Sequence, residues 1–385
     1  MLDVVVVGGG PAGLYCALLL AEEGFDVSLL EEHERLGAPT HCTGVVSNEL
    51  SDLFKVSESL VLNRPRTCLI HSPAGRVFPF DSGGEDIVVI DRGEFDRDLG
   101  TAAQRAGVEV RTGFRAIRVG LEPGGVRVHG AGGSVGARVC VLACGVGYGL
   151  QRQLALDLPS RFLHSAQLEV DAHGAPPSVE LYLGQEIAPE GYGWAVPVMR
   201  GERPRMKVGV VTRGDAERRL DALVSADGVL ERLAGPPDPP VRRLLPVGPA
   251  RRTYGERVIT VGDAAGLTKP TTGGGIFYGL VSGLLAAETL AEALRRDRLA
   301  ASDLRAYEIR WRGRLGPDLR ISSFVRRLFA RLTDQDLEIL LGALGSDDVR
   351  GAIRQTARFN WHGELLRTLL ARPGVRSTLF QAFFR

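Results

Sequence analysis

Two glycine-rich stretches near opposite ends of the chain have residue types and spacing suited to holding a dinucleotide. The first follows an apolar run and reads Gly8-Gly9-Gly10-Pro11-Ala12-Gly13, which contains the spacing Gly-x-Gly-x-x-Gly. In this pattern Gly8 permits a tight turn, Gly10 lets the main chain approach a pyrophosphate, and Gly13 lets the next helix pack closely on the strand. The stretch therefore predicts a dinucleotide site.

Such a site requires a strand, a turn, a helix and a second strand around the glycines. The run from Asp3 to Val7 predicts a strand buried on both faces, and Ala12 to Glu23 predicts a helix whose first N–H groups face phosphates. A second strand, Asp26 to Leu30, carries Glu31 at its carboxyl end. A carboxylate there accepts hydrogen bonds from ribose hydroxyls and disfavours a 2′-phosphate, which favours FAD or NAD over NADP.

The second glycine-rich stretch follows the predicted strand Val258 to Val261. Asp263 lies in the turn after this strand and can bind a sugar-alcohol hydroxyl, and Gly273 to Gly275 open a predicted helix from Ile276 to Leu290. Main-chain N–H groups at such a helix start stabilise the negative charge on the N1–C2 carbonyl edge of a reduced flavin. A nicotinamide dehydrogenase needs no such feature, so this stretch favours FAD.

Arg92 and Cys42 are further candidates, and each has two interpretations. Asp91 is expected to cap a helix with Arg92 in its first turn, where a cation opposes the helix dipole. Arg92 therefore either binds an external anion such as phosphate or is simply exposed to solvent. Cys42 lies in a loop of small residues, and its spacing alone favours inert packing over a functional thiol. The adjacent His41 is expected at the surface or in a hydrogen bond.

The middle of the chain predicts a sheet that forms the wall of a pocket. From Phe162 to Thr212, apolar residues recur at every second position, which predicts antiparallel strands. The segment from Cys68 to Phe80 predicts a hairpin. Tyr192 and Trp194 lie two residues apart, so they share one strand face. They either pack in the core or line an apolar pocket, and we favour the pocket because the flanking glycines remove neighbouring bulk.

These motifs together resemble FAD-dependent oxidoreductases of the para-hydroxybenzoate hydroxylase fold, and among them the geranylgeranyl reductase family. The likeness covers nearly the whole chain. The stretches similar to the reductase branch in particular are Lys269 to Ile276, Tyr192-x-Trp194-x-x-Pro197 and Cys42-x-Gly44-x-x-Ser47. The resemblance implies a mixed α/β and α+β fold with a Rossmann-like FAD-binding domain, an inserted antiparallel-sheet substrate domain and a C-terminal helical region.

The resemblance also implies the site residues. Those expected to bind FAD are Gly8, Gly10, Pro11, Ala12, Gly13, Glu31, Glu32, Cys42, Thr43, Gly44, Arg92, Gly145, Gly262, Asp263, Pro270, Gly273, Gly274, Gly275 and Ile276. Tyr192, Trp194 and Pro197 would contact a prenyl chain, and Cys42 would lie beside the flavin ring as the candidate catalytic residue. The Asp-Gly pair usual after the returning strand of this fold is Cys144-Gly145 here.

The expected domains follow from these assignments. The FAD-binding domain comprises residues 1–60, 85–160 and 250–294, and the substrate domain comprises residues 61–84 and 161–249. Residues 295–385 form the helical region. A chain of 385 residues exceeds the usual size of a single hydrophobic core, in keeping with several domains.

Composition excludes several classes of function. Lys and Arg number 47 against 46 Asp and Glu, for a net charge of +1, so no overall field attracts nucleic acid. The five cysteines are scattered and lack the sequence spacing of a zinc site, so we expect no metal site. Their odd number and spacing also favour free thiols, as in a reducing cellular compartment. No targeting segment precedes the first strand, and no apolar run approaches about eighteen residues. We therefore expect a cytoplasmic protein.

The C-terminal region is locally basic, with 18 arginines against 10 acidic residues after position 294. Ser323 to Leu332 and Leu365 to Phe384 combine Phe and Leu with Arg at helical spacing. This pattern indicates either peripheral contact with an anionic membrane or ordinary packing over the pocket, which we favour. The segment from Asp334 to Leu341 is acidic and is expected to face water.

The resulting functional hypothesis is hydride transfer from reduced flavin to an isoprenoid double bond, with Cys42 or water supplying the proton. An external electron donor such as NAD(P)H or ferredoxin must reduce the flavin. One alternative is a hydroxylase of the same fold. A halogenase is disfavoured because it needs a reactive lysine near the pocket, and of the three lysines Lys269 belongs to the flavin loop. Another alternative is a flavin-containing lipid-binding or electron-carrier protein without turnover.

Overall fold

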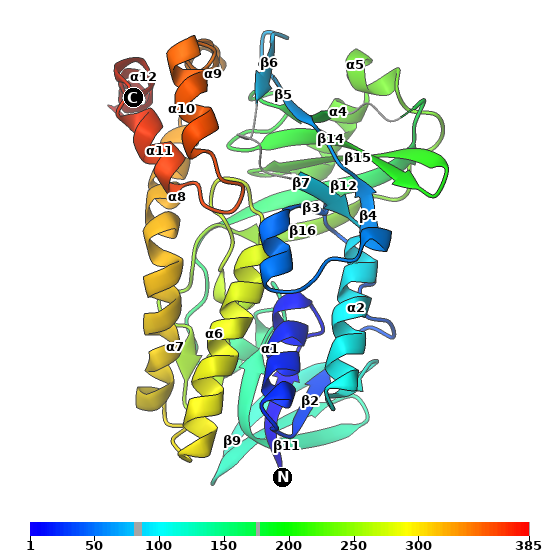
Figure 1. Ribbon diagram of the computed structural model, residues 1–385, viewed down its shortest axis with the longest axis vertical. Coiled ribbons are helices and arrows are strands. Elements are labelled where there is room, and N and C mark those ends of the chain that lie inside the picture. The colour runs from blue at the N-terminus through cyan, green and yellow to red at the C-terminus, as the bar shows by residue number, and fades with distance from the viewer. Residues whose placement is uncertain (81–86, 175–177, 385) are drawn as a thin grey trace. The chain divides into compact units, whose positions relative to one another are not determined.

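The structure is a computed structural model that describes residues 1–80, 87–174 and 178–384 (Figure 1). The chain forms two compact units, each assembled from three segments. The first unit comprises Met1–Thr40, Arg92–Arg161 and Pro246–Pro317, and the second comprises His41–Asp91, Phe162–Leu245 and Asp318–Arg385. Residues 41–60 fall in the second unit, although they were expected in the FAD-binding domain. Residues 295–385, expected as one helical region, are divided between the two units. The division into three domains stays a prediction.

The first unit is built on a mostly parallel sheet. Its central strands are β1 (Leu2–Val7), β2 (Val27–Leu30), β8 (Glu109–Arg111), β11 (Gly133–Leu142) and β18 (Val258–Thr260). Their order is β18-β11-β1-β2-β8 and all pairs are parallel, with β17 (Tyr254–Gly255) antiparallel at one edge. The strands predicted at residues 3–7, 26–30 and 258–261 are confirmed. The chain's valine-rich runs therefore form a Rossmann-like sheet.

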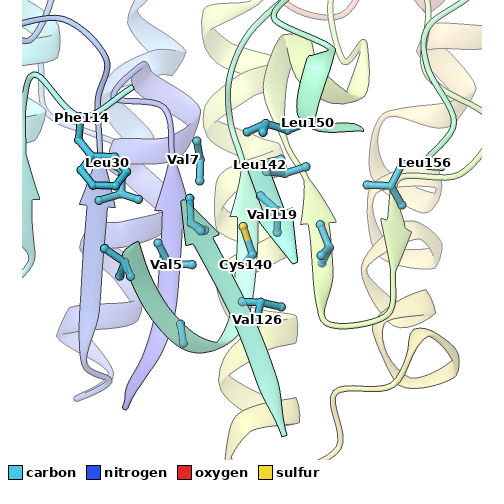
Figure 2. Packing of buried hydrophobic residues seen from close by; sticks show 14 residues of the cluster. Val5, Val7, Leu30, Phe114, Val119, Val126, Cys140, Leu142, Leu150 and Leu156 are labelled. Carbon is cyan, nitrogen blue, oxygen red and sulfur yellow. The ribbon is translucent and has the colours of Figure 1, made fainter. Parts of the chain in front are cut away.

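Helices cover one face of this sheet and a hairpin covers the other. The helices are α1 (Pro11–Glu22), α2 (Arg92–Arg105), α6 (Ile276–Arg295) and α7 (Ala301–Arg314), and they lie side by side in Figure 1. The hairpin of β9 (Ala116–Glu122) and β10 (Gly125–Gly130) extends from β11. Figure 2 shows the buried cluster on the hairpin side, where Val5 and Cys140 lie close to Val119 and Val126. Short elements of this unit are α3 (Gly149–Gln153) and η3 (Gly262–Ala265).

Helix α6 is a core helix of the first unit. Among the described residues it is the helix long and apolar enough to cross a membrane, but 72% of its most apolar window is buried inside the protein. It packs against α1 at very short range, since a Cβ added at Gly283 would lie 2.7 Å from the carbonyl oxygen of Ala12. The apolar character of α6 is thus used in helix packing.

The second unit contains a seven-stranded sheet with the order β16-β12-β15-β14-β13-β5-β6. Its strands are β5 (Thr67–His71), β6 (Val77–Phe80), β12 (Phe162–Asp171), β13 (Ser178–Tyr182), β14 (Tyr192–Arg200), β15 (Arg203–Thr212) and β16 (Val241–Pro246). The predicted hairpin and the antiparallel strands from Phe162 to Thr212 are confirmed. The hairpin joins them through β5, which pairs with β13 in parallel.

Both faces of the central strands in this sheet are covered. Helix α4 (Ala216–Val224) packs on β12 and β15, and seven consecutive residues of β15 from Met206 to Thr212 are buried. A smaller sheet has the order β3-β7-β4, from Val45–Ser47, Ile87–Ile90 and Val61–Asn63. The short helices are α5 (Asp227–Leu230), η1 (Asn48–Asp52) and η2 (Glu58–Leu60).

The C-terminal region is helical, as predicted. Its helices are α8 (Gly316–Phe329), α9 (Asp334–Leu344), α10 (Asp347–Thr356), α11 (Gly363–Leu370) and α12 (Pro373–Phe384). Leu328, Leu332, Leu337, Val375 and Leu379 form one buried cluster, which agrees with the packing interpretation. The segment 334–341 faces water only in part. Asp336 is 3% exposed because its carboxylate accepts hydrogen bonds from the main chain and hydroxyl of Thr333, as a helix cap.

We expect Gly283→Ala to lower the free energy of unfolding by about 1–3 kcal/mol, because its methyl group would push α6 away from α1. Gly313→Ala in α7 is the matched control, since no described atom lies within 4 Å of its Cβ position. This control should raise stability by up to about 1 kcal/mol through helix propensity. Urea unfolding of both variants measures the difference, and equal midpoints would contradict the close packing of α6 on α1.

Candidate functional site

The glycines of the first motif divide into two kinds. Gly8 has φ +113°, and a Cβ there would lie 2.3 Å from the carbonyl oxygen of Ala143. A Cβ at Gly13 would lie 2.2 Å from the carbonyl oxygen of Gly8. By contrast, no described atom lies within 4 Å of the Cβ position of Gly10. Gly8 and Gly13 therefore allow close packing, whereas Gly10 leaves open space at the start of α1 for a pyrophosphate.

Glu31 is held in place at the end of β2. Its carboxylate is buried, with one oxygen accepting a hydrogen bond from the main chain of Gly9 at 2.7 Å. The other oxygen accepts from the main chain of His33 at 2.9 Å and lies 2.5 Å from His33 Nδ1. The neighbouring Glu32 is instead exposed and lies 3.6 Å from Arg115 Nε. Glu31 is thus the acid oriented toward the glycine turn, as a ribose-binding carboxylate requires.

The structure brings the second motif to the first. Gly262 has φ +58°, and its Cβ position lies 2.9 Å from the Cβ of Ala12 in α1. The main chain of Gly262 donates to Ser282 Oγ at 2.9 Å, which fixes η3 on α6. Asp263 Oδ1 lies 2.9 Å from the Cβ position of Gly275. Two stretches from opposite ends of the chain therefore meet at the start of α1, which is the geometry that one dinucleotide site needs.

The loop before α6 closes into a turn. Lys269 donates from its main chain to Gly274 at 3.1 Å and accepts from Gly273 at 2.8 Å, while Pro270 is buried between them. Helix α6 then begins at Ile276 without a side-chain cap on its first N–H groups. These groups are the donors that the sequence assigns to the flavin edge. Gly145, with φ +57°, follows β11 in the same unit.

Arg92 forms an ion pair within its own helix. Its Nε and Nη2 donate to the two carboxylate oxygens of Asp96 at 3.0 and 2.7 Å. Burial raises the pKa of Asp96, and the charge of Arg92 offsets this only in part. The interpretation of Arg92 as a solvated arginine is wrong, because its side chain is only 14% exposed. Its contact with an FAD diphosphate stays a prediction.

The Cys42 loop belongs to the second unit, where a buried glutamine of β12 holds it. Gln167 donates to the carbonyl oxygen of Cys42 at 3.4 Å and accepts from the Thr43 hydroxyl at 3.3 Å. Cys42 Sγ accepts from the main chain of Gly44 at 3.3 Å. A Cβ at Gly44 would lie 2.3 Å from the carbonyl oxygen of Ile90, so the loop packs tightly on β7.

Tyr192 and Trp194 lie on one face, with ring centroids 5.9 Å apart. The indole of Trp194 crosses the neighbouring strand at Gly209, where an added Cβ would lie 2.3 Å from the ring. Burial raises the pKa of Tyr192 to about 12. The flanking glycines do not expose the rings, because the Cβ position of Gly191 lies 1.6 Å from the carbonyl oxygen of Val211. They permit close strand packing, and Gly209 is the residue that makes room for the indole.

The sequence did not reveal the roles of Gln167 in β12 and Lys207 in β15, which both contact the Cys42 loop. Gln167 also contacts β14, the strand that carries Tyr192 and Trp194 and is called the aromatic strand below. Trp194 Nε1 donates to the Gln167 side-chain oxygen at 3.3 Å, so one amide contacts both Trp194 and the loop. Lys207 Nζ donates to the carbonyl oxygen of Thr43 at 2.9 Å. The only signal in the sequence is that each of the two is a polar residue within a predicted strand.

Two smaller findings concern Pro197 and His41. Pro197 accepts a hydrogen bond from the Asn63 amide at 2.8 Å through its carbonyl oxygen. His41 is half-buried, and its ring interacts with the main chain of Val241, in keeping with the hydrogen-bonding alternative, although Nε2 has no hydrogen-bond partner among the described residues. Burial, with a further contribution from the charge of Arg243, lowers the pKa of His41 to about 4. His41 is therefore neutral at physiological pH.

The predicted site residues are thus divided between the two units. Cys42, Thr43, Gly44 and the aromatic strand lie in the second unit, and the other predicted FAD-binding residues lie in the first. Within the first unit the structure brings Glu31 to Gly9 and Gly262 to Ala12, whereas Glu32 is exposed. That Cys42 lies beside the flavin ring stays a prediction.

Comparison with known proteins agrees with this site. A family model described as an NAD(P)-binding Rossmann-like domain matches residues 6–51. Digeranylgeranylglycerophospholipid reductase 2 of Methanopyrus kandleri is 32% identical, over 90% of this chain and 91% of its own. A geranylgeranyl bacteriochlorophyll reductase-like protein of Thermoplasma acidophilum has the same fold, with a TM-score of 0.86 at 24% identity over 99% of both chains. A halogenase solved in complex with FAD has a TM-score of 0.69 at 17% identity, over 99% of this chain and 94% of its own.

The fold and the glycine cradle define a Rossmann-like FAD-dependent oxidoreductase. On its sequence identity to the reductases, the chain belongs to the geranylgeranyl reductase family.

We expect Gly10→Ala and Gly8→Ala to separate cofactor binding from folding. Gly10→Ala should leave the stability of the apoprotein unchanged and weaken FAD binding by about tenfold or more, because its methyl group fills the space for the pyrophosphate. Gly8→Ala should destabilise the apoprotein itself, since φ +113° is strained for alanine and the Ala143 carbonyl blocks the methyl group. Flavin titration and urea unfolding measure the two effects. Full FAD affinity in Gly10→Ala would remove this turn from the site.

Proposed function

We propose that this enzyme saturates carbon–carbon double bonds in the isoprenoid chains of a geranylgeranyl-type lipid. The observation that carries the proposal is the linked arrangement of Trp194, Gln167 and Cys42, which joins an aromatic strand to a thiol-bearing loop. The printed names of the sequence relatives, which are reductases of digeranylgeranylglycerophospholipid, support the choice of substrate class. An apolar substrate also agrees with the aromatic face of β14, where Tyr192 is half-buried and Trp194 is buried.

In this proposal the protein binds, orients and supplies a proton. FAD, when bound and reduced, supplies a hydride from N5 of its flavin ring. Glu31 accepts from the ribose, the first N–H groups of α1 bind the pyrophosphate, and those of α6 stabilise the negative edge of the flavin. Tyr192 and Trp194 contact the prenyl chain. Cys42 or water gives a proton to the second carbon of the double bond.

The electron donor and the location are part of the proposal. An external donor such as NAD(P)H or ferredoxin reduces the flavin, and the protein acts in the cytoplasm with peripheral contact to the membrane that holds its substrate. Support for this contact is the excess of arginine after position 294, which attracts anionic lipid. Sedimentation with anionic liposomes at low and high salt tests it, and the absence of salt-sensitive binding would oppose it.

An anaerobic assay separates this function from its alternatives. Purified protein with FAD, dithionite and a prenylated lipid should give a product heavier by about two mass units per saturated bond. A hydroxylase would instead require oxygen and add an oxygen atom. A carrier without turnover would show flavin reduction with unaltered lipid. Unchanged lipid without oxygen would therefore refute the reductase proposal.

We expect Cys42→Ser to separate the two interpretations of this thiol. If Cys42 donates the proton, the variant keeps FAD and accepts electrons but forms product about 10²–10⁴-fold more slowly. Cys140→Ser is the matched control, because the Cys140 thiol is buried in the hairpin-side cluster of the first unit, whereas the Cys42 loop belongs to the second unit. Anaerobic flavin reoxidation by a prenyl substrate measures the step. Equal rates in the parent and Cys42→Ser would mean that Cys42 only packs.

A further inference from the structure

Helix α3 holds the turn that carries Asp263. Strands β11 and β18 pair in parallel, so α3 after β11 and η3 after β18 begin at the same edge of the sheet. The Tyr148 hydroxyl, at the start of α3, donates to the carbonyl oxygen of Asp263 at 3.1 Å. The Gln151 amide donates to the carbonyl oxygen of Ala264 at 2.6 Å. Two side chains of one short helix thus bind two consecutive carbonyls of η3.

The turn is fixed through all of its carbonyls and presents a single side chain. Besides the two side chains of α3, the donors to the carbonyl oxygens of η3 are the main-chain N–H groups of Ala250, Gly266 and Leu267, each at 3.0 Å. Of residues 261–270, which the structure describes in full, Asp263 alone is not buried. What the turn presents is therefore the carboxylate that is predicted to bind the sugar-alcohol chain of FAD.

The Asp263 carboxylate is packed against the start of α6. Its Oδ1 lies 2.9 Å from the Cβ position of Gly275, the residue before that helix. A shift of η3 would therefore move the carboxylate relative to the first N–H groups of α6. Burial raises the pKa of the Tyr148 phenol and the charge of Asp263 adds to this, so the hydroxyl stays protonated and can donate.

The number of hydrogen bonds does not explain a glutamine at position 151. Gln151 is fully buried, and its NH₂ group must face Ala264, because a carbonyl oxygen can only accept. Its Oε1 then has no hydrogen-bond partner among the described residues. A methionine of similar shape would leave the Ala264 carbonyl unpaired instead, so either residue leaves one buried acceptor unpaired. What the glutamine adds is a fixed position for this carbonyl.

We propose that Tyr148 and Gln151 are positioning residues of the cofactor site, which orient the Asp263 carboxylate toward the sugar-alcohol chain of FAD by holding the carbonyls of its turn. In this role they act through the turn and not through a contact with the flavin. The role depends on the site predicted for Asp263, and the lipid substrate does not enter it.

The first experiment compares the binding of FAD with the binding of ADP, which is one half of FAD. ADP has the pyrophosphate and ribose that the glycine turn and Glu31 are predicted to bind, but it lacks the sugar-alcohol chain. Tyr148→Phe and Gln151→Met should each weaken FAD binding by about tenfold and change ADP binding less than about twofold. Titration of the apoprotein measures both affinities. A general loosening of the first unit would weaken both ligands alike.

Two matched controls remove the same kind of hydrogen bond elsewhere in the first unit. The buried Tyr307 hydroxyl donates to the carbonyl oxygen of Thr260 at 3.0 Å. The Gln153 amide, also in α3, donates to the carbonyl oxygen of Ile117 at 2.9 Å. Tyr307→Phe and Gln153→Met should keep the FAD affinity of the parent, even where they lower the urea midpoint. A loss of FAD affinity in Tyr307→Phe equal to that in Tyr148→Phe would contradict a specific role of the turn.

The second experiment is a double-mutant cycle with Asp263→Ala. Because Tyr148 acts through Asp263, Tyr148→Phe should weaken FAD binding by less than about twofold once Asp263→Ala is present. Additive losses would overturn the inference, as would equal losses for FAD and ADP. Parent FAD affinity in either Tyr148→Phe or Asp263→Ala would overturn it too. Tyr148→Phe removes one oxygen atom, so the test stands even if Gln151→Met does not fold.

Neither experiment uses lipid, so they fail separately from the proposed function. Selective loss of FAD affinity together with unaltered lipid in the anaerobic assay would keep the role of Tyr148 and Gln151 and reject the substrate. Saturated lipid together with parent FAD affinity in Tyr148→Phe would keep the reductase and reject this role.

Discussion

The FAD cradle depends on contacts between main-chain segments that are too close for any side chain. At the turn after β1, a Cβ on Gly8 would lie 2.3 Å from the carbonyl oxygen of Ala143. Around Ala12, a Cβ on Gly283 would lie 2.7 Å from the carbonyl oxygen of Ala12, and one on Gly262 would lie 2.9 Å from its methyl group. These contacts join β11, η3 and α6 to the start of α1. The turn that holds Gly10 is thus fixed by the packing of the first unit, so the candidate cofactor site forms from the same contacts as the core.

The sequence is enough to predict a structural feature when the residues that cause it lie in one contiguous stretch. β1, the glycine turn, α1, β2 and Glu31 were predicted with borders that differ by a residue or so, because hydrophobic period, turn glycines and helix signals are all local. The pairing of Arg92 with Asp96 was also available in the sequence. The two residues stand four apart on a helix, which is the spacing at which opposite charges meet.

The sequence was not sufficient where a residue takes its role from a distant partner. Gln167 and the Cys42 carbonyl are 125 positions apart, and Lys207 and the Thr43 carbonyl are 164 apart. Neither polar residue differs in local pattern from a strand residue that faces water. β15 is buried on both faces from Met206 to Thr212, and this hides the alternation that would reveal such residues. Asp336 is a different case, because its partner Thr333 is only three residues away and the Thr-x-x-Asp capping box that buries it is a local signal in the sequence.

The orientation of the Gln167 amide follows from its neighbours and ties the aromatic strand to the Cys42 loop. Trp194 Nε1 can only donate a hydrogen bond, so the amide group facing it must be the oxygen. The NH₂ group is then directed to the Cys42 carbonyl, and a flipped amide would set two N–H groups against each other. A displacement of the indole therefore changes the support of the Cys42 main chain through a single side chain. Because Lys207 holds the next carbonyl along the loop, the thiol is fixed from two strands, β12 and β15, whose register leaves it little freedom to move on its own.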